Sequence, residues 1–324
     1  MRDRLPSSEE NSILLAGSSH PQLTQEIAKS SGVPLGRMRN LSFPDGETFL
    51  EILESVRGKT VFVLQSIAHH PNEYLMELLI AADALKRASA KEIIAIIPYF
   101  GYCRQDRKSR PRTPITAKLV ADLLATAGAT RVIVMDLHAE QVEGFFNIPV
   151  DHLTARKLLA EAIKKDGFPQ TGKQGIVVAP DAGGIKIARA FSKELGADFA
   201  VIDKHRLNAS QVEVLNLIGE IKGKDVLLAD DMCSTGATLA SAAKACQEKG
   251  AKRIIAVVTH GLFIEPAIEA IERSPIDVIY VADTIQLNES AKNLKFLRLV
   301  PTASLFGKAI NCTISNQSIS SLFL

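Results

Sequence analysis

The segment Asp225–Leu239 contains the residues whose types and spacing are best suited to chemistry. Its apolar run, Val226–Ala229, is typical of a buried strand and ends in two adjacent carboxylates, Asp230 and Asp231. Small and hydroxyl residues come next, followed by a helical pattern from about Leu239 to Lys249. Backbone N–H groups at a helix N-terminus can cradle a phosphate, and hydroxyls can donate further hydrogen bonds to it. The residues of this loop are Ser234, Thr235, Gly236, Ala237 and Thr238.

The two carboxylates would repel a phosphate that touched them directly. They suit the hydroxyls of a sugar, or a metal-bound water. A phosphate cradle beside paired acids therefore favours a sugar phosphate as the ligand. The alternative is an ordinary strand-to-helix turn, in which the same residue types form a helix cap. The residue types of this segment leave both interpretations open.

A second candidate segment is Tyr99–Arg112, in which Arg and Lys recur from Arg104 onward. It follows an apolar run that predicts a strand, and ligands of open α/β sheets bind at the carboxyl ends of strands. A dense group of cations in a chain of balanced charge favours a polyanion the size of a triphosphate. The alternative is a solvated charged loop, and the neighbouring Tyr99 and Phe100 favour a site.

Composition excludes several classes of protein. The chain has 324 residues, with 38 Lys and Arg against 36 Asp and Glu, so a net charge of +2 gives no general attraction to nucleic acid. The four cysteines are widely spaced and form no CxxC pair, which is typical of reduced thiols. The N-terminus lacks the apolar region of a signal peptide, and no apolar run is long enough to predict a membrane span. We therefore expect a cytoplasmic protein that binds neither membrane nor nucleic acid.

Apolar runs and amphipathic stretches alternate along the chain, which predicts an α/β fold with mainly parallel sheets flanked by helices. The predicted strands are Ile13–Gly17, Thr60–Gln65, Glu92–Pro98, Arg131–Asp136, Gly175–Pro180, Phe199–Asp203, Asp225–Asp230, Arg253–Thr259 and Val278–Val281. The predicted helices are Asn72–Ala88, Ile115–Ala127, Thr154–Lys165, Gly184–Leu195 and Thr238–Lys249.

Two stretches of the sequence are similar to one another. Ala90–Gly101 begins A-K-E-I-I-A-I-I, Ala251–Gly261 begins A-K-R-I-I-A-V-V, and each follows an Ala-rich helical pattern. We interpret this as a duplication that made two similar domains, although separate helix–turn–strand units could converge on such strings. The predicted domains are residues 1–153 and 154–306, with a tail, 307–324, that packs back on the first domain.

Several motifs together resemble those of phosphoribosyl-pyrophosphate (PRPP) synthetases, most closely the phosphate-activated class. Pro98–Lys108 is similar to the family signature P-Y-F-G-Y-x-R-Q-D-R-K, and the resemblance covers nearly all of the chain from about Asn11. The phosphate loop alone also resembles the PRPP-binding loop of phosphoribosyltransferases. The other matching segments are Phe43–Glu47 (F-P-D-G-E), Pro114–Gly128, Val134–His152, Ala179–Gly184 (A-P-D-A-G-G) and Ile202–Arg206 (I-D-K-H-R).

The resemblance implies two phosphoribosyltransferase-like domains, with ATP bound by residues 1–153 and ribose 5-phosphate by residues 154–306. It implies that the diphosphoryl group of ATP passes to the 1-hydroxyl of ribose 5-phosphate, which gives PRPP and AMP for nucleotide biosynthesis. Mg²⁺ is the implied cofactor and inorganic phosphate the implied activator. The implied assembly is a homo-oligomer in which dimers build a hexamer.

Site residues follow from the resemblance at matching positions. For ATP they are Phe43, Asp45, Glu47, Arg104, Gln105, Arg107 and His138, the first three reaching the adenine bound by a neighbouring subunit. His138 and Asp181 are implied to position Mg²⁺, and Lys204 and Arg206 to close over the transferring group as a flexible catalytic loop. The residues implied for ribose 5-phosphate are Asp230, Asp231, Ser234, Thr235, Gly236, Ala237 and Thr238.

The chain departs from the family pattern within the sugar-phosphate loop. Ser234 stands where most bacterial and animal relatives have Asp, and Ala237 stands where they have Gly. A Ser cannot supply the charge of an Asp, so the assignment of a base there stays open. Regulation by phosphate as activator and ADP as inhibitor is implied at Ser55, Arg57, Ser318 and Ser320.

Two other classes of function are weighed against the synthetase. A phosphoribosyltransferase would use PRPP, would release no AMP and would need neither F-P-D-G-E nor the basic segment. A non-catalytic regulatory subunit would keep the fold and lose catalytic positions, whereas Arg104, His138, Lys204 and Asp230 are all present here. We therefore predict an active synthetase.

Overall fold

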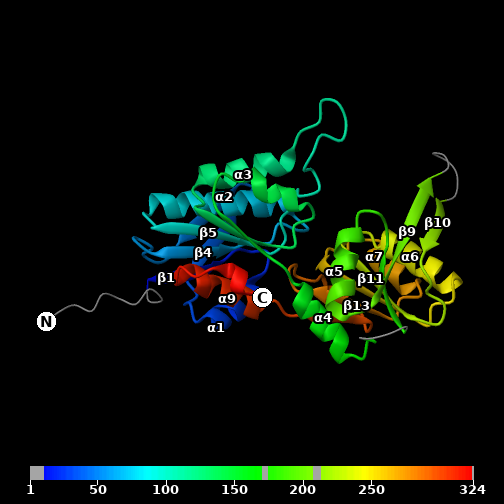
Figure 1. The fold of residues 1–324 in the computed structure, drawn as a ribbon. Helices are drawn as coiled ribbons and strands as arrows, with labels where there is room; N and C mark the ends of the chain where they lie inside the picture. Colours follow the sequence, from blue (N-terminus) through cyan, green and yellow to red (C-terminus); the bar gives the residue numbers. More distant parts are fainter. Residues whose placement is uncertain (1–10, 170–173, 207–212, 323–324) are drawn as a thin grey trace. The chain divides into compact units, whose positions relative to one another are not determined.

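The computed structural model describes residues 11–169, 174–206 and 213–322, and its chain divides into two compact units (Figure 1). The second unit consists of Thr154–Asp283 and Leu287–Pro301, and the first consists of the remainder. The expected second domain also began at residue 154 but ran to 306. The difference arises because helix α9 (Ala303–Ile314) packs against α1 (Pro21–Ser31), so the C-terminal segment joins the first unit from Thr302 onward.

The first unit is built on a five-stranded parallel sheet with the strand order β1-β4-β5-β6-β7. Helices α2 and α3 cover one face of the sheet, and α1 and α9 cover the other (Figure 1). An antiparallel hairpin of β2 and β3 is separate from this sheet, and a short 3-10 helix, η1, follows β6. The bounds are β1 Ser12–Ala16, β2 Met38–Ser42, β3 Thr48–Ile52, β4 Thr60–Leu64, α2 Pro71–Arg87, β5 Glu92–Ile97, α3 Thr116–Ala127, β6 Arg131–Met135, η1 Glu140–Phe145 and β7 Val150–Leu153.

The second unit is built on a seven-stranded sheet with the order β10-β9-β8-β11-β12-β13-β14. All neighbouring strands are parallel except β9 and β10. Helices α4 and α5 pack together, as do α6 and α7. The bounds are α4 Arg156–Lys165, β8 Gly175–Ala179, α5 Ile185–Leu195, β9 Asp198–Arg206, β10 Glu213–Ile218, β11 Asp225–Cys233, α6 Ala237–Glu248, β12 Arg253–Gly261, α7 Ala267–Glu272, β13 Val278–Ala282, α8 Glu289–Lys292 and β14 Leu297–Val300. A short 3-10 helix, Ile319–Leu322, follows α9 in the first unit.

The two sheets repeat one topology. The strand order β1-β4-β5-β6-β7 matches β8-β11-β12-β13-β14, and in each unit a helix and an antiparallel strand pair separate the first two strands of the set. The two similar stretches of sequence form β5 and β12, the middle strand of each set. Two similar α/β domains therefore make up the chain.

Continuous apolar runs form the central strands because helices cover both faces of each sheet. In β5 the five residues from Ile93 to Ile97 are all buried, and in β11 so are the four from Val226 to Ala229. Alternate strand residues, such as Val61, Val63 and Ile97, pack against α2 and α3 in one cluster of the core. These rigid strands fix the positions of the polar residues that follow their carboxyl ends.

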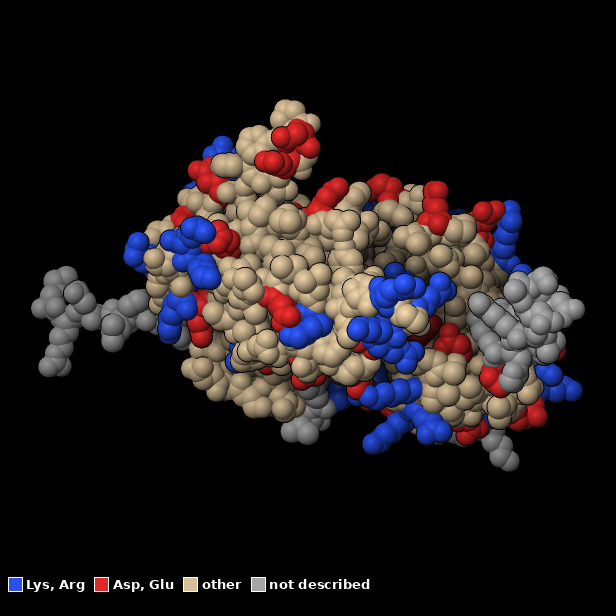
Figure 2. Space-filling model, turned by 90° about the horizontal axis from the view of Figure 1, so that it is seen from above, with Lys and Arg blue, Asp and Glu red and all other residues tan. Residues whose placement is uncertain are grey.

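The surface carries mixed charge. Figure 2 shows separate groups of basic and of acidic side chains on the face in view, with broad areas between them that carry neither. In the described ranges, no helix combines the length and the apolar character that crossing a membrane requires.

Candidate active site

The phosphate loop of the second unit lies between β11 and α6. Strand β11 continues to Cys233, three residues further than expected, so Asp230 and Asp231 belong to the strand itself. Helix α6 begins at Ala237, and its N-cap is Gly236, a residue without a side chain that could cap it. The first N–H groups of α6 are therefore left without a side-chain cap, and the helix dipole adds positive potential there. Ser234 and Thr238 are partly exposed, and Thr235 and Ala237 are exposed.

Three carboxylates lie close together at the carboxyl ends of two neighbouring strands. Asp230 and Asp231 lie near the carboxyl end of β11, and Asp181 follows β8, the strand paired with β11. Burial, and then the charges of Asp231 and Asp181, raise the pKa of Asp230 to about 8. One oxygen of Asp181 accepts the Gly184 N–H at 3.1 Å, at the start of α5. Carboxylates that repel one another favour hydroxyl donors or a cation as partners, although no group of three or more His, Cys, Asp and Glu side chains in the described part of the chain is placed to hold a metal ion by itself.

A buried thiol, that of Cys233, lies beneath this loop. Burial, and then the charge of Asp230, raise the pKa of Cys233 to about 12. The thiol is therefore protonated at neutral pH, and it is a poor nucleophile and metal ligand. Its role is to pack beneath the loop.

Gly236 is the position in the loop where a side chain would cause the most backbone strain and the closest contact. Its φ is +71°, and a Cβ there would lie 3.0 Å from the Ala267 carbonyl oxygen of α7. Gly236→Ala is expected to cost roughly 1–2 kcal/mol of stability through backbone strain and to displace the loop from α7. We expect the KM for ribose 5-phosphate to rise about tenfold, because the N–H groups of the cradle lose their alignment.

The matched control is Gly223→Ala. Gly223 has a φ of +73° with no atom within 4 Å of a built Cβ, so it carries the same backbone strain without the contact. For both variants, the melting temperature and the KM values for ATP and for ribose 5-phosphate are measured. If both variants raise the KM for ribose 5-phosphate equally, the loop is not positioned by its contact with α7.

The candidate ATP residues of the first unit follow two neighbouring parallel strands, β5 and β6. After β5, Tyr99 and Phe100 are buried, and the chain then emerges so that Arg104, Gln105 and Arg107 are exposed. After β6, Asp136 adopts a φ of +38° and His138 is exposed. A hydrogen bond from Gln141 of η1 to Asp106 joins the two segments. The structure therefore brings the basic segment and His138 to the same edge of the sheet.

Gln105 is anchored to the start of helix α3. Its side-chain oxygen accepts a hydrogen bond from Thr116 Oγ1 at 2.6 Å, and its carbonyl oxygen accepts the Ala117 N–H at 3.2 Å. Thr116 is not among the site residues predicted from the sequence, although a hydroxyl residue two positions after Pro114 marks the start of this helix. Thr116 fixes the orientation of Gln105.

The F-P-D-G-E segment forms the turn of the β2–β3 hairpin. The turn is closed by Phe43 N–H to the Glu47 carbonyl at 2.8 Å, and by Glu47 N–H to Asp45 Oδ1 at 3.1 Å. The Phe43 side chain is 50% exposed and meets Phe49 edge to face. A half-exposed aromatic side chain at a hairpin turn is available to a partner. Asp45 and Glu47 are exposed beside it.

Lys204 and Arg206 lie at the end of β9, where the resemblance implied a loop. Lys204 is paired with Leu215 and Arg206 with Glu213 in the antiparallel ladder with β10, which is why the backbone is extended there. The side chains of Lys204 and Arg206 lie outside the part of the chain that the structure describes. The following residues, 207–212, also lie outside it.

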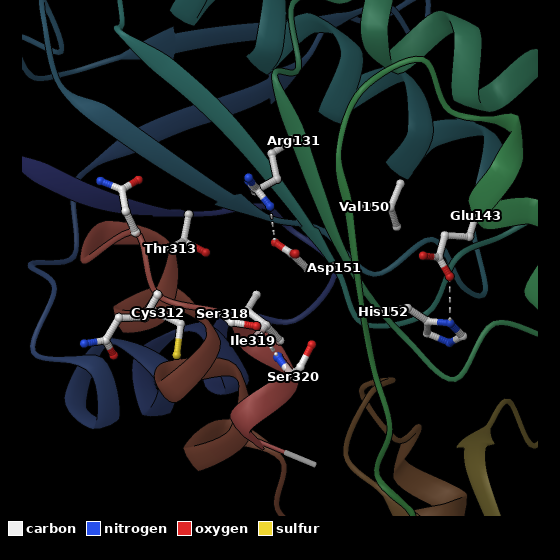
Figure 3. Close-up of a pocket in the computed structure, with 12 residues that line it drawn as sticks. Arg131, Glu143, Val150, Asp151, His152, Cys312, Thr313, Ser318, Ile319 and Ser320 are labelled. Atoms are coloured by element: carbon white, nitrogen blue, oxygen red, sulfur yellow. Dashed lines mark hydrogen bonds and ion pairs between the residues drawn. The ribbon is translucent and has the colours of Figure 1, made fainter. Parts of the chain in front are cut away.

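A cavity of about 570 Å³ opens in the first unit beside β7 and the residues that follow α9 (Figure 3). Ser318 and Ser320 line it, as does the ion pair between Arg131 and Asp151 at 2.7 Å. Ser55 and Arg57 are exposed between β3 and β4, and are not among the described residues that line this cavity. Of the four residues implied for regulation, Ser318 and Ser320 therefore line this cavity. The other lining residues are Glu143, Val150, His152, Cys312, Thr313, Asn316, Gln317 and Ile319.

Comparison with known proteins identifies the family. Residues 12–128 match the model of the N-terminal domain of ribose phosphate pyrophosphokinase, and residues 149–284 match the phosphoribosyl transferase domain. The chain is 48% identical over 310 residues to a ribose-phosphate pyrophosphokinase of Fusobacterium nucleatum, covering 96% of this chain and 97% of that one. It is 48% identical over 311 residues to another of Wolinella succinogenes, covering 96% and 98%.

A solved structure agrees with these sequence relatives. Phosphoribosylpyrophosphate synthetase from Mycobacterium smegmatis superposes with a TM-score of 0.88 at 40% identity, covering 94% of this chain and 99% of that one. Both domains and their order are thus shared over nearly the whole length. The chain belongs to the ribose-phosphate pyrophosphokinase family.

Proposed function

We propose that this chain transfers the β,γ-diphosphoryl group of ATP to the 1-hydroxyl of ribose 5-phosphate. The oxygen of that hydroxyl forms a bond to the β-phosphorus, and the bond from the β-phosphorus to the α–β bridging oxygen breaks. AMP leaves with the bridging oxygen, and the hydroxyl proton passes to solvent. One observation carries the proposal. A single chain of this family contains a helix N-terminus without a side-chain cap, next to two adjacent aspartates, and also an exposed basic segment.

Ribose 5-phosphate is assigned to the loop between β11 and α6. The 5-phosphate accepts hydrogen bonds from the first N–H groups of α6 and from the hydroxyls of Ser234, Thr235 and Thr238. Gly236 and Ala237 add little bulk, so the backbone can approach the phosphate closely. Asp230 and Asp231 accept from the ribose hydroxyls. The absence of an acid at Ser234 leaves the loop one negative charge short of most relatives, which favours the bound phosphate.

ATP is assigned to the edge of the other sheet. Arg104 and Arg107 supply charge for the phosphates, Gln105 is oriented by Thr116, and His138 approaches from the loop after β6. We assign Phe43, Asp45 and Glu47 to the adenine bound by another copy of the chain, because Phe43 is half exposed at a hairpin turn.

This assignment requires a homo-oligomer, for which we propose dimers that build a hexamer. An isolated monomer is then expected to be inactive. Activity and particle mass measured together during dilution test this, and a fully active monomer would contradict it.

Mg²⁺ is the metal implied for the reaction, and carboxylate oxygens such as those of Asp181, Asp230 and Asp231 are ligands that it prefers. Among the described residues, no group of three or more His, Cys, Asp and Glu side chains is placed to hold a metal ion by itself, so oxygens of the bound phosphates would have to supply further ligands. We assign Asp181 of the second unit and His138 of the first unit to positioning Mg²⁺ and ATP. When bound, Mg²⁺ neutralises charge on phosphate oxygens.

Lys204 and Arg206 are assigned to the transferring group. Diphosphoryl transfer needs in-line positioning and neutralisation of charge more than covalent assistance. Two cations near the transferred phosphorus supply that neutralisation, and enclosing the site limits attack by water. We expect the diphosphoryl transfer to take place in the cytoplasm, where the four buried thiols stay reduced.

Regulation by inorganic phosphate is proposed at Ser55, Arg57, Ser318 and Ser320, with ADP as the inhibitor. We expect added phosphate to raise the rate of the wild-type protein. Arg57→Ala is expected to raise the half-saturating phosphate concentration about tenfold, because Arg binds oxyanions through charge-assisted hydrogen bonds. Initial rates across a phosphate titration measure this. A wild-type rate that does not change with phosphate concentration would reject the proposal.

The activity is tested by incubating the protein with Mg-ATP labelled at the γ-phosphate and with ribose 5-phosphate. We expect AMP and PRPP in equal amounts, with the label in PRPP. Omitting ribose 5-phosphate should stop AMP formation, which separates transfer from hydrolysis. ADP as the product would indicate transfer of a single phosphoryl group, and no product would favour a non-catalytic relative. Consumption of added PRPP with a base would indicate a phosphoribosyltransferase.

A further inference from the structure

His152 joins the cavity of the first unit to the loop that carries His138. Its Nε2 accepts the Leu137 N–H at 3.0 Å, and its Nδ1 lies 3.6 Å from a carboxylate oxygen of Glu143. Figure 3 shows His152 and Glu143 facing each other across this edge of the cavity. The residue therefore touches both the cavity wall and the backbone next to His138.

The loop after β6 depends on strand β7 for its shape. Asp136 has a φ of +38°, a conformation that a residue with a side chain adopts only where its surroundings hold it. Its N–H donates to the Leu153 carbonyl at 3.0 Å, and the next N–H, that of Leu137, donates to the His152 ring. Two consecutive N–H groups are thus held by two consecutive residues of β7. The second of these bonds lies directly before His138.

The hydrogen bond defines the tautomer of His152. A ring nitrogen that accepts a hydrogen bond carries no proton, so in the neutral ring the proton is on Nδ1. The carboxylate of Glu143 faces that proton at a distance suited to electrostatic attraction, although it is too long for a hydrogen bond. The His152 side chain is only 19% exposed, so water has limited access to take its place.

We propose that His152 is a positioning residue for the transfer reaction. It holds Leu137 N–H and so sets the direction in which the loop presents His138, while Glu143 favours the tautomer that can accept. The proposal rests on the role assigned to His138 in the proposed function. His152 itself touches neither substrate.

The test compares three variants in the full chain. His152→Leu removes the acceptor and keeps an apolar side chain, whereas His152→Gln places an amide oxygen near the position of Nε2. The matched control is Thr130→Val, because Thr130 Oγ1 accepts the Ile93 N–H at 3.0 Å at the opposite end of β6. His152→Leu and Thr130→Val each remove a side-chain acceptor of a backbone N–H in the same sheet. Only His152 contacts the loop after β6.

Hydrogen exchange of the Leu137 amide gives the readout that does not depend on activity. We expect exchange to quicken about tenfold or more in His152→Leu, to stay slow in Thr130→Val and to be largely restored in His152→Gln. Steady-state rates give the second readout. We expect kcat/KM for ATP to fall about tenfold in His152→Leu with the KM for ribose 5-phosphate unchanged, and to recover in His152→Gln.

The outcomes separate this proposal from the proposed function. A wild-type protein that forms no AMP and PRPP would reject the proposed function. Hydrogen exchange would still report whether His152 holds the Leu137 N–H. A wild-type protein that is active, with His152→Leu no different from Thr130→Val in exchange and in kcat/KM for ATP, would overturn the role of His152. Equal losses for both substrates in His152→Leu would show a general structural role and overturn it as well.

Discussion

Replacing Lys204 by alanine is expected to lower kcat by a factor of about 10³–10⁵ and to leave ATP binding nearly unchanged. The reason is that a cation near the transferring group stabilises charge that develops in the transition state, whereas Arg104 and its neighbours are proposed to bind the nucleotide in the ground state. The measurement is a pair of assays, turnover by PRPP formation and affinity by equilibrium binding of ATP.

Two further variants make the Lys204 result specific. Lys193→Ala removes an exposed cation from the last turn of α5 in the same unit and is expected to have no effect on turnover. Lys204→Arg keeps the charge and should retain part of the activity, since the guanidinium differs in shape and hydration. Near-normal turnover in Lys204→Ala would remove this residue from the mechanism.

Asp230→Asn is expected to stabilise the ligand-free protein and to impair catalysis. At pH 8, removing a carboxylate that burial and two neighbouring charges disfavour should raise the free energy of unfolding by roughly 1–3 kcal/mol. The same change removes a charged acceptor for the ribose hydroxyls, so kcat/KM for ribose 5-phosphate should fall about 10- to 100-fold. A residue that costs stability and supports function is typical of an active site.

The raised pKa of Asp230 also fixes the sign of a pH dependence. In the unfolded chain this carboxyl titrates near 3.8, and in the folded protein near 8. Between these values the folded state binds more protons than the unfolded state, so its stability falls as pH rises. The contribution of Asp230 is fully present below about pH 4 and is lost by about pH 8.

Denaturant unfolding across that pH range measures the effect. In Asp230→Asn the decline in the free energy of unfolding should be shallower than in the wild type. Asp225→Asn, at the amino end of the same strand, is the matched control and should keep the wild-type slope. Identical slopes for the wild type and Asp230→Asn would mean that neither burial nor the neighbouring carboxylates raise the pKa of Asp230 in the folded protein.

Much of the fold could be predicted from the sequence, because the central strands are continuous apolar runs. All nine predicted strands exist with small shifts at their ends, and so do all five predicted helices. The five missed strands are β2, β3, β7, β10 and β14. Four of them lack that signal: β2 and β3 have no buried residue, and β7 and β14 each have only one. Helix α9 was missed although Leu305, Phe306, Ala309 and Ile310 recur with a helical period.

The phosphate loop and the basic segment could be found because each is contiguous in sequence. The cluster of carboxylates could not be derived from spacing, since Asp181 and Asp230 are brought together only by the pairing of β8 with β11. In the same way, only the fold shows that Thr116 holds Gln105 and that His152 holds Leu137.

The sequence by itself determined which residue types are present for binding two phosphorylated ligands, and which elements precede them, because strand and loop patterns are local. Tertiary structure alone decided which charges meet, how far the pKa of Asp230 rises and where the C-terminal helix packs. The physical reason is that burial and electrostatic repulsion depend on distances in space. Those distances are set by sheet order and helix packing, which no local pattern records.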